Sequence, residues 1–241
     1  MEFRERGTRP HRGLFVAFEG VERAGKTTQI ELLKRWVQES LGLQTETFKF
    51  PDRASPTGSL IVSYLKGELY LESRAAQLLF ASNIWGQMGN IRDFLLEEPE
   101  TITICDRFIY SSIAYGASQD VEWGGDPHDC RKWYAGLYDG CIVPDLVINL
   151  VADPSELSKR PGFGEELNDK VELLKNVQTE YAAMFNHRFW QNLNALDTRE
   201  HVHRDVVEAV EGLFGRWTSL KEPKGSSLLR HFDSNTFQQA N

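Results

Sequence analysis

The chain has 241 residues, of which 41% are hydrophobic and 26% charged, as is ordinary for one globular domain with a full core. Its formal net charge of −8 argues against a protein that coats nucleic acid, which would normally carry a basic surface. No apolar stretch is long enough to span a membrane. The three cysteines lack paired spacing and imply neither a disulfide framework nor a zinc site. We therefore expect a cytoplasmic protein, with nuclear or organellar placement left open, that binds neither membranes nor nucleic acid.

The most informative stretch is residues 20–27, which match the pattern G-x-x-x-x-G-K-T of a phosphate-binding loop. A buried-strand pattern precedes it at residues 14–19, and apolar residues at helical spacing follow it over 26–40. A glycine-rich turn with a chance lysine is the competing interpretation, and both flanks argue against it. Glycines let the backbone approach phosphate oxygens, and a helix N-terminus adds partial positive charge. We expect Lys26 to reach nucleotide phosphates and Thr27 to bind Mg²⁺.

Strand and helix patterns alternate along the rest of the chain. Alternation of this kind predicts an α/β fold with three α/β/α layers and a five-stranded parallel sheet, as in P-loop NTPases. Residues 1–12 are expected to be a flexible arm, 13–220 a single domain with a lid near 158–168, and 221–241 a tail that frays. Further strands are predicted near 44–50, 101–105, 145–151 and 192–196, and further helices near 60–65, 72–96, 110–116, 127–138, 171–185 and 202–217.

The remaining unusual sequences follow other strands. Residues 51–53 come after the second predicted strand, and Asp106 and Arg107 end the third. Ligands of parallel sheets bind outside the carboxyl ends of the strands, so these residues should meet the phosphate-binding loop. Asp106 has the place of the Mg²⁺-linked acid of P-loop proteins, with a helix N-cap as its other interpretation. Arg53 and Arg107 suit phosphate oxygens and together indicate a second phosphate beside the first.

These motifs together resemble the thymidylate kinase family, of the eukaryotic and viral type. The resemblance implies transfer of the γ-phosphoryl group of ATP to dTMP, giving dTDP. It also implies ATP and Mg²⁺ as cofactors and a homodimer as the assembly. The matching segments are residues 22–29, 50–53, 78–80, 83 and 85, 106–108, 111 and 114–115, 144–146, and 160 with 163–164, in the order of the family over roughly residues 13–215.

The resemblance also implies roles for individual residues. Arg53 would hold the acceptor phosphate, and Phe80, which its apolar helix alone would place in the core, would stack on thymine. The implied catalytic residues are Arg23, Lys26, Asp106 and Arg107, and the implied metal ligands are Thr27 and Asp106. The implied ATP-binding residues are Gly20, Glu22, Arg23, Ala24, Gly25, Lys26, Thr27, Thr28 and Arg160. The implied dTMP-binding residues are Glu22, Phe50, Arg53, Phe80, Asn83, Arg107, Ser111 and Tyr115.

Several positions depart from the pattern of the family, among them Leu167 and Asn168, where the family often has Arg and Tyr in the lid. Ile84 stands where the family has an arginine that contacts the base, and isoleucine cannot donate a hydrogen bond. We therefore expect looser discrimination between bases. Glu22 replaces the usual aspartate of the loop. The alternatives are a relaxed kinase of (deoxy)nucleoside monophosphates and, less favoured, a non-catalytic nucleotide-binding protein.

Overall fold

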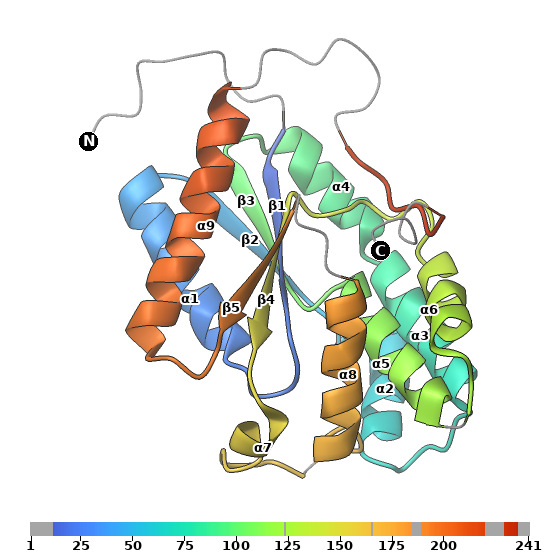
Figure 1. Ribbon diagram of the computed structural model, residues 1–241. Helices are drawn as coiled ribbons and strands as arrows, with labels where there is room; N and C mark the ends of the chain where they lie inside the picture. Colours follow the sequence, from blue (N-terminus) through green and yellow to red (C-terminus); the bar gives the residue numbers. More distant parts are fainter. Residues whose placement is uncertain (1–11, 123, 165, 185–188, 220–228, 236–241) are drawn as a thin grey trace.

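A computed structural model describes residues 12–122, 124–164, 166–184, 189–219 and 229–235 (Figure 1). Five parallel strands form one twisted sheet in the order β2-β3-β1-β4-β5. The predicted α/β architecture with a five-stranded parallel sheet is therefore confirmed. The strands are β1 (Leu14–Glu19), β2 (Gln44–Lys49), β3 (Thr101–Asp106), β4 (Leu146–Val151) and β5 (Trp190–Asn194).

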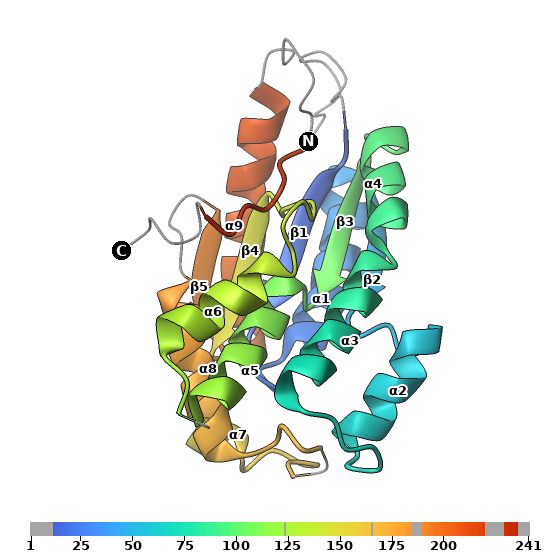
Figure 2. The same ribbon diagram turned by 90° about the vertical axis from the view of Figure 1, so that its right-hand side faces the viewer.

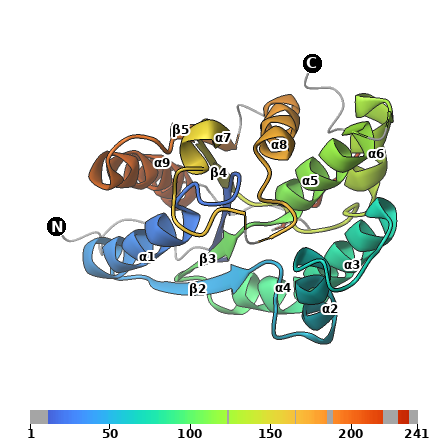
Figure 3. The same ribbon diagram turned by 90° about the horizontal axis from the view of Figure 1, so that it is seen from below.

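Helices cover both faces of the sheet (Figures 1 and 2). Figure 3 looks toward the carboxyl ends of the strands, with α1 and α9 on one side of the sheet and α3, α4, α5 and α8 on the other. In the described part of the chain, no helix has the length and apolar character needed to cross a lipid bilayer. The helices are α1 (Lys26–Trp36) with the π-helical turn η1 (Val37–Leu41), α2 (Pro56–Leu65), α3 (Ser73–Trp85), α4 (Met88–Glu97), α5 (Ile109–Glu122), α6 (Pro127–Gly136), α7 (Pro154–Leu157), α8 (Val171–Ala183) and α9 (Arg199–Ser219).

Several helices differ from the sequence prediction: α5 extends beyond the predicted 110–116, α7 was not predicted, and two further differences have local reasons. The helix predicted over residues 72–96 is divided into α3 and α4, with Gly86 just after the end of α3. Helix α2 begins at Pro56 rather than near residue 60. The Ser55 side chain accepts a hydrogen bond from the Gly58 amide, and proline suits the first helical position because it has no amide hydrogen to satisfy.

The central strand carries an acidic residue into the interior. All residues of β1 are buried, because β3 and β4 flank it and helices cover both of its faces. Its first residues contribute to an apolar core in which Phe15 contacts Phe108 edge to face, with ring centroids 5.2 Å apart. Glu19, the last residue of β1, is 0% exposed. The fold therefore requires hydrogen-bond donors around this carboxyl group.

The ends of the chain only partly follow the prediction. Residues 1–11 of the expected arm lie outside the described residues, but Arg12 donates two hydrogen bonds to Asp145, of 2.8 and 2.6 Å. The expectation of a frayed tail is wrong for residues 229–235. There the Phe232 amide donates to the Cys141 carbonyl at 2.7 Å, and Ser234 donates to the Asp139 carboxylate. An apolar anchor explains the difference, since Phe232 is buried against the core.

We predict that Phe232→Ala lowers the free energy of unfolding by about 3 kcal/mol, because it leaves a cavity where an aromatic ring is buried. Urea denaturation followed by circular dichroism measures the change. Asn235→Ala, at an exposed position of the same segment, is the matched control and should have a negligible effect. Equal stability of both variants would contradict the packing of this segment.

Candidate active site

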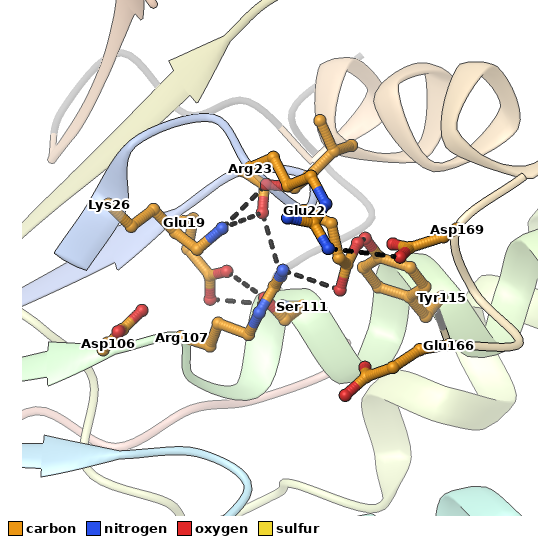
Figure 4. Close-up of polar contacts among 12 residues, drawn as sticks. Glu19, Glu22, Arg23, Lys26, Asp106, Arg107, Ser111, Tyr115, Glu166 and Asp169 are labelled. Carbon is orange, nitrogen blue, oxygen red and sulfur yellow. Dashed lines mark hydrogen bonds and ion pairs between the residues drawn. The ribbon is translucent and has the colours of Figure 1, made fainter. Parts of the chain in front are cut away.

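The carboxyl ends of β1, β2 and β3 open into one pocket of about 400 Å³. Its walls come from the phosphate-binding loop, the segment after β2, helix α3, the start of α5 and the segment between α7 and α8, which contains the predicted lid (residues 158–168). The predicted site residues that line it are Glu22, Arg23, Lys26, Thr27, Phe50, Arg53, Phe80, Asn83, Asp106, Arg107, Ser111 and Tyr115. Figure 4 shows how part of this set converges.

The backbone of the phosphate-binding loop depends on its glycines. Gly20 has φ of +127°, and a Cβ atom there would lie 2.5 Å from the carbonyl oxygen of Leu150 on β4. Gly25 caps α1 with φ of 97°, also in the left-handed region that favours glycine. Ala24 is buried, whereas Thr28 is exposed and does not line the pocket. The two glycines therefore let the loop pass close to β4 and lead directly into α1.

Lys26 lies under this loop. Its Nζ donates hydrogen bonds of 3.0 and 2.7 Å to the carbonyl oxygens of Gly20 and Val21. Burial, together with repulsion from Arg107, lowers the pKa of Lys26 to about 7. An anion placed beside the amine would favour its charged form. The geometry is thus that of a buried amine suited to a phosphate group.

Thr27 and Asp106 bring two oxygen ligands together at the edge of the loop. The Thr27 hydroxyl donates to Asp106 Oδ2 at 2.9 Å, and Lys49 Nζ lies 3.6 Å from the same oxygen. A hydroxyl and a carboxylate beside a phosphate-binding loop are oxygen donors of the kind that Mg²⁺ prefers. This pair of oxygen donors therefore fits the metal that the sequence predicts.

Glu19 is a residue of the site that the sequence analysis missed. Its carboxyl oxygens accept hydrogen bonds from the amides of Phe108 and Ser111 and from the hydroxyl groups of Ser111 and Tyr181. Burial raises the pKa of Glu19, while the hydrogen bond from Ser111 opposes the rise. Glu19 thus caps the start of α5 from the end of β1. An acidic residue ending an otherwise apolar buried strand was the available signal.

Arg107 crosses the pocket between the loop and α5 (Figure 4). Its backbone has φ of 67°, and its amide donates to the Phe18 carbonyl at 2.9 Å. Its guanidinium donates to the Gly20 carbonyl at 2.9 Å and to Glu22 Oε1 at 2.8 Å. The second oxygen of Glu22 accepts from the Tyr115 hydroxyl, and the guanidinium lies 5.6 Å from the centre of the Tyr115 ring. Glu22 therefore orients both an arginine and an aromatic ring.

The lid contacts the phosphate-binding loop through two arginines. Arg23 donates to the carbonyl oxygens of Pro161 and Gly162, the first at 2.5 Å, and lies 3.7 Å from Asp169 Oδ2. Arg160 donates in the opposite direction, to the Arg23 carbonyl. Arg160 does not line the pocket. The lid is thus fastened to the loop at the side of the pocket where Arg23 lies.

The other side of the pocket holds the second cluster of predicted residues. Arg53 Nη2 lies 2.7 Å from Glu166 Oε1 in the predicted lid. Phe80 is partly buried and lines the pocket, with its ring centroid 6.3 Å from that of Tyr64. Asn83 is 2% exposed. Its Oδ1 accepts a hydrogen bond of 2.7 Å from the Asp52 amide, and its Nδ2 donates one of 3.1 Å to the Asp52 carbonyl oxygen. Asn83 therefore holds the loop that presents Arg53.

Comparison with known proteins adds independent information. A family model described as Thymidylate kinase matches residues 18–209. Thymidylate kinase of Plasmodium falciparum is 32% identical over 199 residues, 83% of this chain and 90% of that protein. Thymidylate kinase of Homo sapiens is 30% identical over 203 residues, 81% of this chain and 88% of that protein. The structure of thymidylate kinase from Candida albicans has a TM-score of 0.77 at 27% identity, covering 92% of this chain and 99% of that chain.

We predict that Glu19→Gln lowers the free energy of unfolding by about 2 kcal/mol, because an amide nitrogen would replace a carboxyl oxygen that faces buried donors. Guanidinium denaturation measures the loss. Glu39→Gln changes the same charge at an exposed position and should be neutral. If the two substitutions had the same effect, Glu19 would not be the cap of α5.

Proposed function

The chain belongs to the thymidylate kinase family and phosphorylates dTMP to dTDP, and from this premise we propose how its pocket holds the two nucleotides. The observation that carries the proposal is the convergence of three cations from three strand ends. Lys26 follows β1, Arg53 follows β2 and Arg107 follows β3, and all three line one pocket. Two phosphate groups side by side are the ligands that this arrangement of charge suits.

The phosphate-binding loop is the proposed site for the ATP phosphates. The amides of residues 20–28 and the N-terminus of α1 would surround the β-phosphate, and Lys26 would exchange its carbonyl partners for phosphate oxygens. Thr27 and Asp106 would hold Mg²⁺, which neutralises charge on the phosphates when bound. Arg160 would act on ATP indirectly, by fixing the carbonyl of Arg23 in the loop.

Catalysis in this proposal is alignment plus positive charge. Phosphoryl transfer passes through a transition state with charge spread over the transferred oxygens, and it asks little covalent chemistry of the protein. Arg107 would lie between the two proposed phosphate sites, and Arg23 lines the same pocket from the loop. The acceptor phosphate is already a nucleophile, so no catalytic base is required. Closure of the lid would exclude water from the reacting groups.

The acceptor nucleotide would occupy the other half of the pocket. Arg53 would leave Glu166 and bind the dTMP phosphate. Phe80 offers a ring face for stacking on thymine, and Phe50 and Tyr115 line the same space. The Ser111 hydroxyl is already engaged by Glu19, so its proposed contribution is to shape the wall of the pocket.

A homodimer is proposed as the assembly. Leu78 and Trp85 are seven positions apart on α3, which places them on one helix face, and they are 52% and 41% exposed. An exposed apolar face of this kind suits a partner subunit. Sedimentation equilibrium at micromolar concentration should give twice the mass of the chain, and the mass of one chain would contradict the proposal.

The activity is tested by ADP release with Mg-ATP and a panel of acceptors: dTMP, dUMP, dCMP, dGMP, UMP, AMP and thymidine. The proposal expects the largest kcat/KM with dTMP and no turnover with thymidine, because Arg53 requires a phosphorylated acceptor. Comparable turnover of several monophosphates would support the relaxed kinase instead. ATP binding without turnover of any acceptor would contradict the assignment of these residues to catalysis.

We predict that Arg53→Ala raises the KM for dTMP at least about tenfold and leaves the KM for ATP within about twofold, because Arg53 binds the ground-state acceptor. Steady-state kinetics with each substrate varied in turn measures both constants. Glu166→Gln removes the charge that competes for Arg53 and should leave the KM for dTMP equal or lower. An Arg53→Ala enzyme with an unchanged KM for dTMP would contradict the placement of the acceptor phosphate.

A further inference from the structure

The base end of the pocket has polar groups that the proposed roles leave unused. Ile84, at 3% exposure, lines this region and offers no hydrogen bond. Gln77 on α3 and Ser112 on α5 line it as well, and they are 3% and 8% exposed. Polar side chains so deeply buried need partners, and their partners decide which of their atoms face a ligand.

A chain of hydrogen bonds sets the orientation of the Gln77 amide. The Tyr138 hydroxyl, which is 0% exposed, donates to Ser112 Oγ, and Ser112 Oγ donates to Gln77 Oε1 at 2.9 Å. Ser112 is the sole hydrogen-bond partner of the Tyr138 hydroxyl group among the described residues. Tyr138 must therefore donate, because otherwise its buried hydrogen would have no acceptor. Ser112 then has its own hydrogen free for Gln77, which presents its oxygen to the serine.

This orientation turns the other end of the amide toward the ligand. With Oε1 bound to Ser112, Gln77 Nε2 has two hydrogens and no hydrogen-bond acceptor among the described residues. The side chain is also held by packing, since a Cβ atom on Gly116 would lie 3.0 Å from Gln77 Cγ. A fixed donor without a protein acceptor, in the wall of the pocket, is suited to an acceptor atom of the substrate.

We propose that Gln77 determines base specificity by donating a hydrogen bond from Nε2 to a carbonyl oxygen on the edge of the base. This inference rests on the proposed function and deepens it. A 4-oxo pyrimidine such as thymine or uracil offers an acceptor there, whereas cytosine presents an amino group whose hydrogens face the Gln77 hydrogens. Rejection of cytosine then follows from two donors facing each other, which costs more than the absence of a contact. Discrimination between thymine and cytosine is thus retained although position 84 carries isoleucine rather than a charged residue.

The test is the substitution Gln77→Glu, with kcat/KM measured at pH 8 for dTMP, dUMP and dCMP. Glutamate still accepts from Ser112, and its second oxygen would accept from the amino group of cytosine. We expect the ratio of kcat/KM for dTMP to kcat/KM for dCMP to fall about a hundredfold. The hydrogen bond to thymine is lost and one to cytosine is gained, and each changes kcat/KM about tenfold. The ratio of dTMP to dUMP, which share the carbonyl, should stay within about twofold.

Gln119→Glu is the matched control, since Gln119 does not line the pocket and the same charge there should leave both ratios unchanged. Ser112→Ala tests the hydrogen-bond chain: without its donor the Gln77 amide can rotate, and the ratio of dTMP to dCMP activity should fall about tenfold. These ratios do not depend on the fraction of enzyme that folds.

An active wild-type enzyme whose ratios are unchanged in both Gln77→Glu and Ser112→Ala would overturn the inference. A wild-type enzyme without activity on any monophosphate would instead overturn the proposed function. A fall of the dTMP to dCMP ratio in Gln119→Glu equal to that in Gln77→Glu would also overturn the inference, because the effect would then be one of charge alone.

Discussion

The site depends on the buried carboxyl group of Glu19. This group ends the central strand and accepts hydrogen bonds from the amides of Phe108 and Ser111 at the start of α5. The phosphate-binding loop begins directly after Glu19, and Arg107 directly precedes Phe108. One carboxyl group therefore fixes the distance between the loop that would hold the donor phosphates and the helix that carries the central arginine. Because burial makes unpaired donors or acceptors costly, this connection has little freedom to slide.

The cations of the pocket already have hydrogen-bond partners, which are oxygen atoms of the protein. Lys26 donates to carbonyls of its own loop, Arg23 to carbonyls of the lid, and Arg53 to Glu166. Substrate phosphates would replace these partners rather than meet bare charges. Two of the exchanges involve the lid, so nucleotide binding and movement of the lid are expected to be coupled. Glu22, which stands where the family has an aspartate, accepts hydrogen bonds from Arg107 and Tyr115 at once. The side chain of glutamate is longer than that of aspartate, and this length permits the arrangement.

The sequence was sufficient for the parts of the protein that depend on local pattern. The bounds of β1 were predicted from a run of apolar residues ahead of the phosphate-binding loop. The place of Asp106 and Arg107 in the pocket was predicted because they come at the end of an apolar strand. Contacts between segments that are distant in the sequence could not be predicted from it. Glu19 reads as one more residue of a strand until Ser111 and Tyr181 are brought to it. Gln77 reads as a polar position on a helix until Ser112 orients its amide. The anchoring of residues 229–235 likewise depends on Phe232 meeting a core built by other segments.

The central claim is that one pocket holds two nucleotides with their phosphates in line. The most direct measurement is inhibition by a bisubstrate compound in which adenosine and thymidine are joined through their 5′ positions by five phosphates. The account predicts competition with both ATP and dTMP, and a lower Kd than for either nucleotide alone, because one molecule would use both sets of cations. Competition with only one of the two substrates would contradict it, since the donor and acceptor sites would then not adjoin.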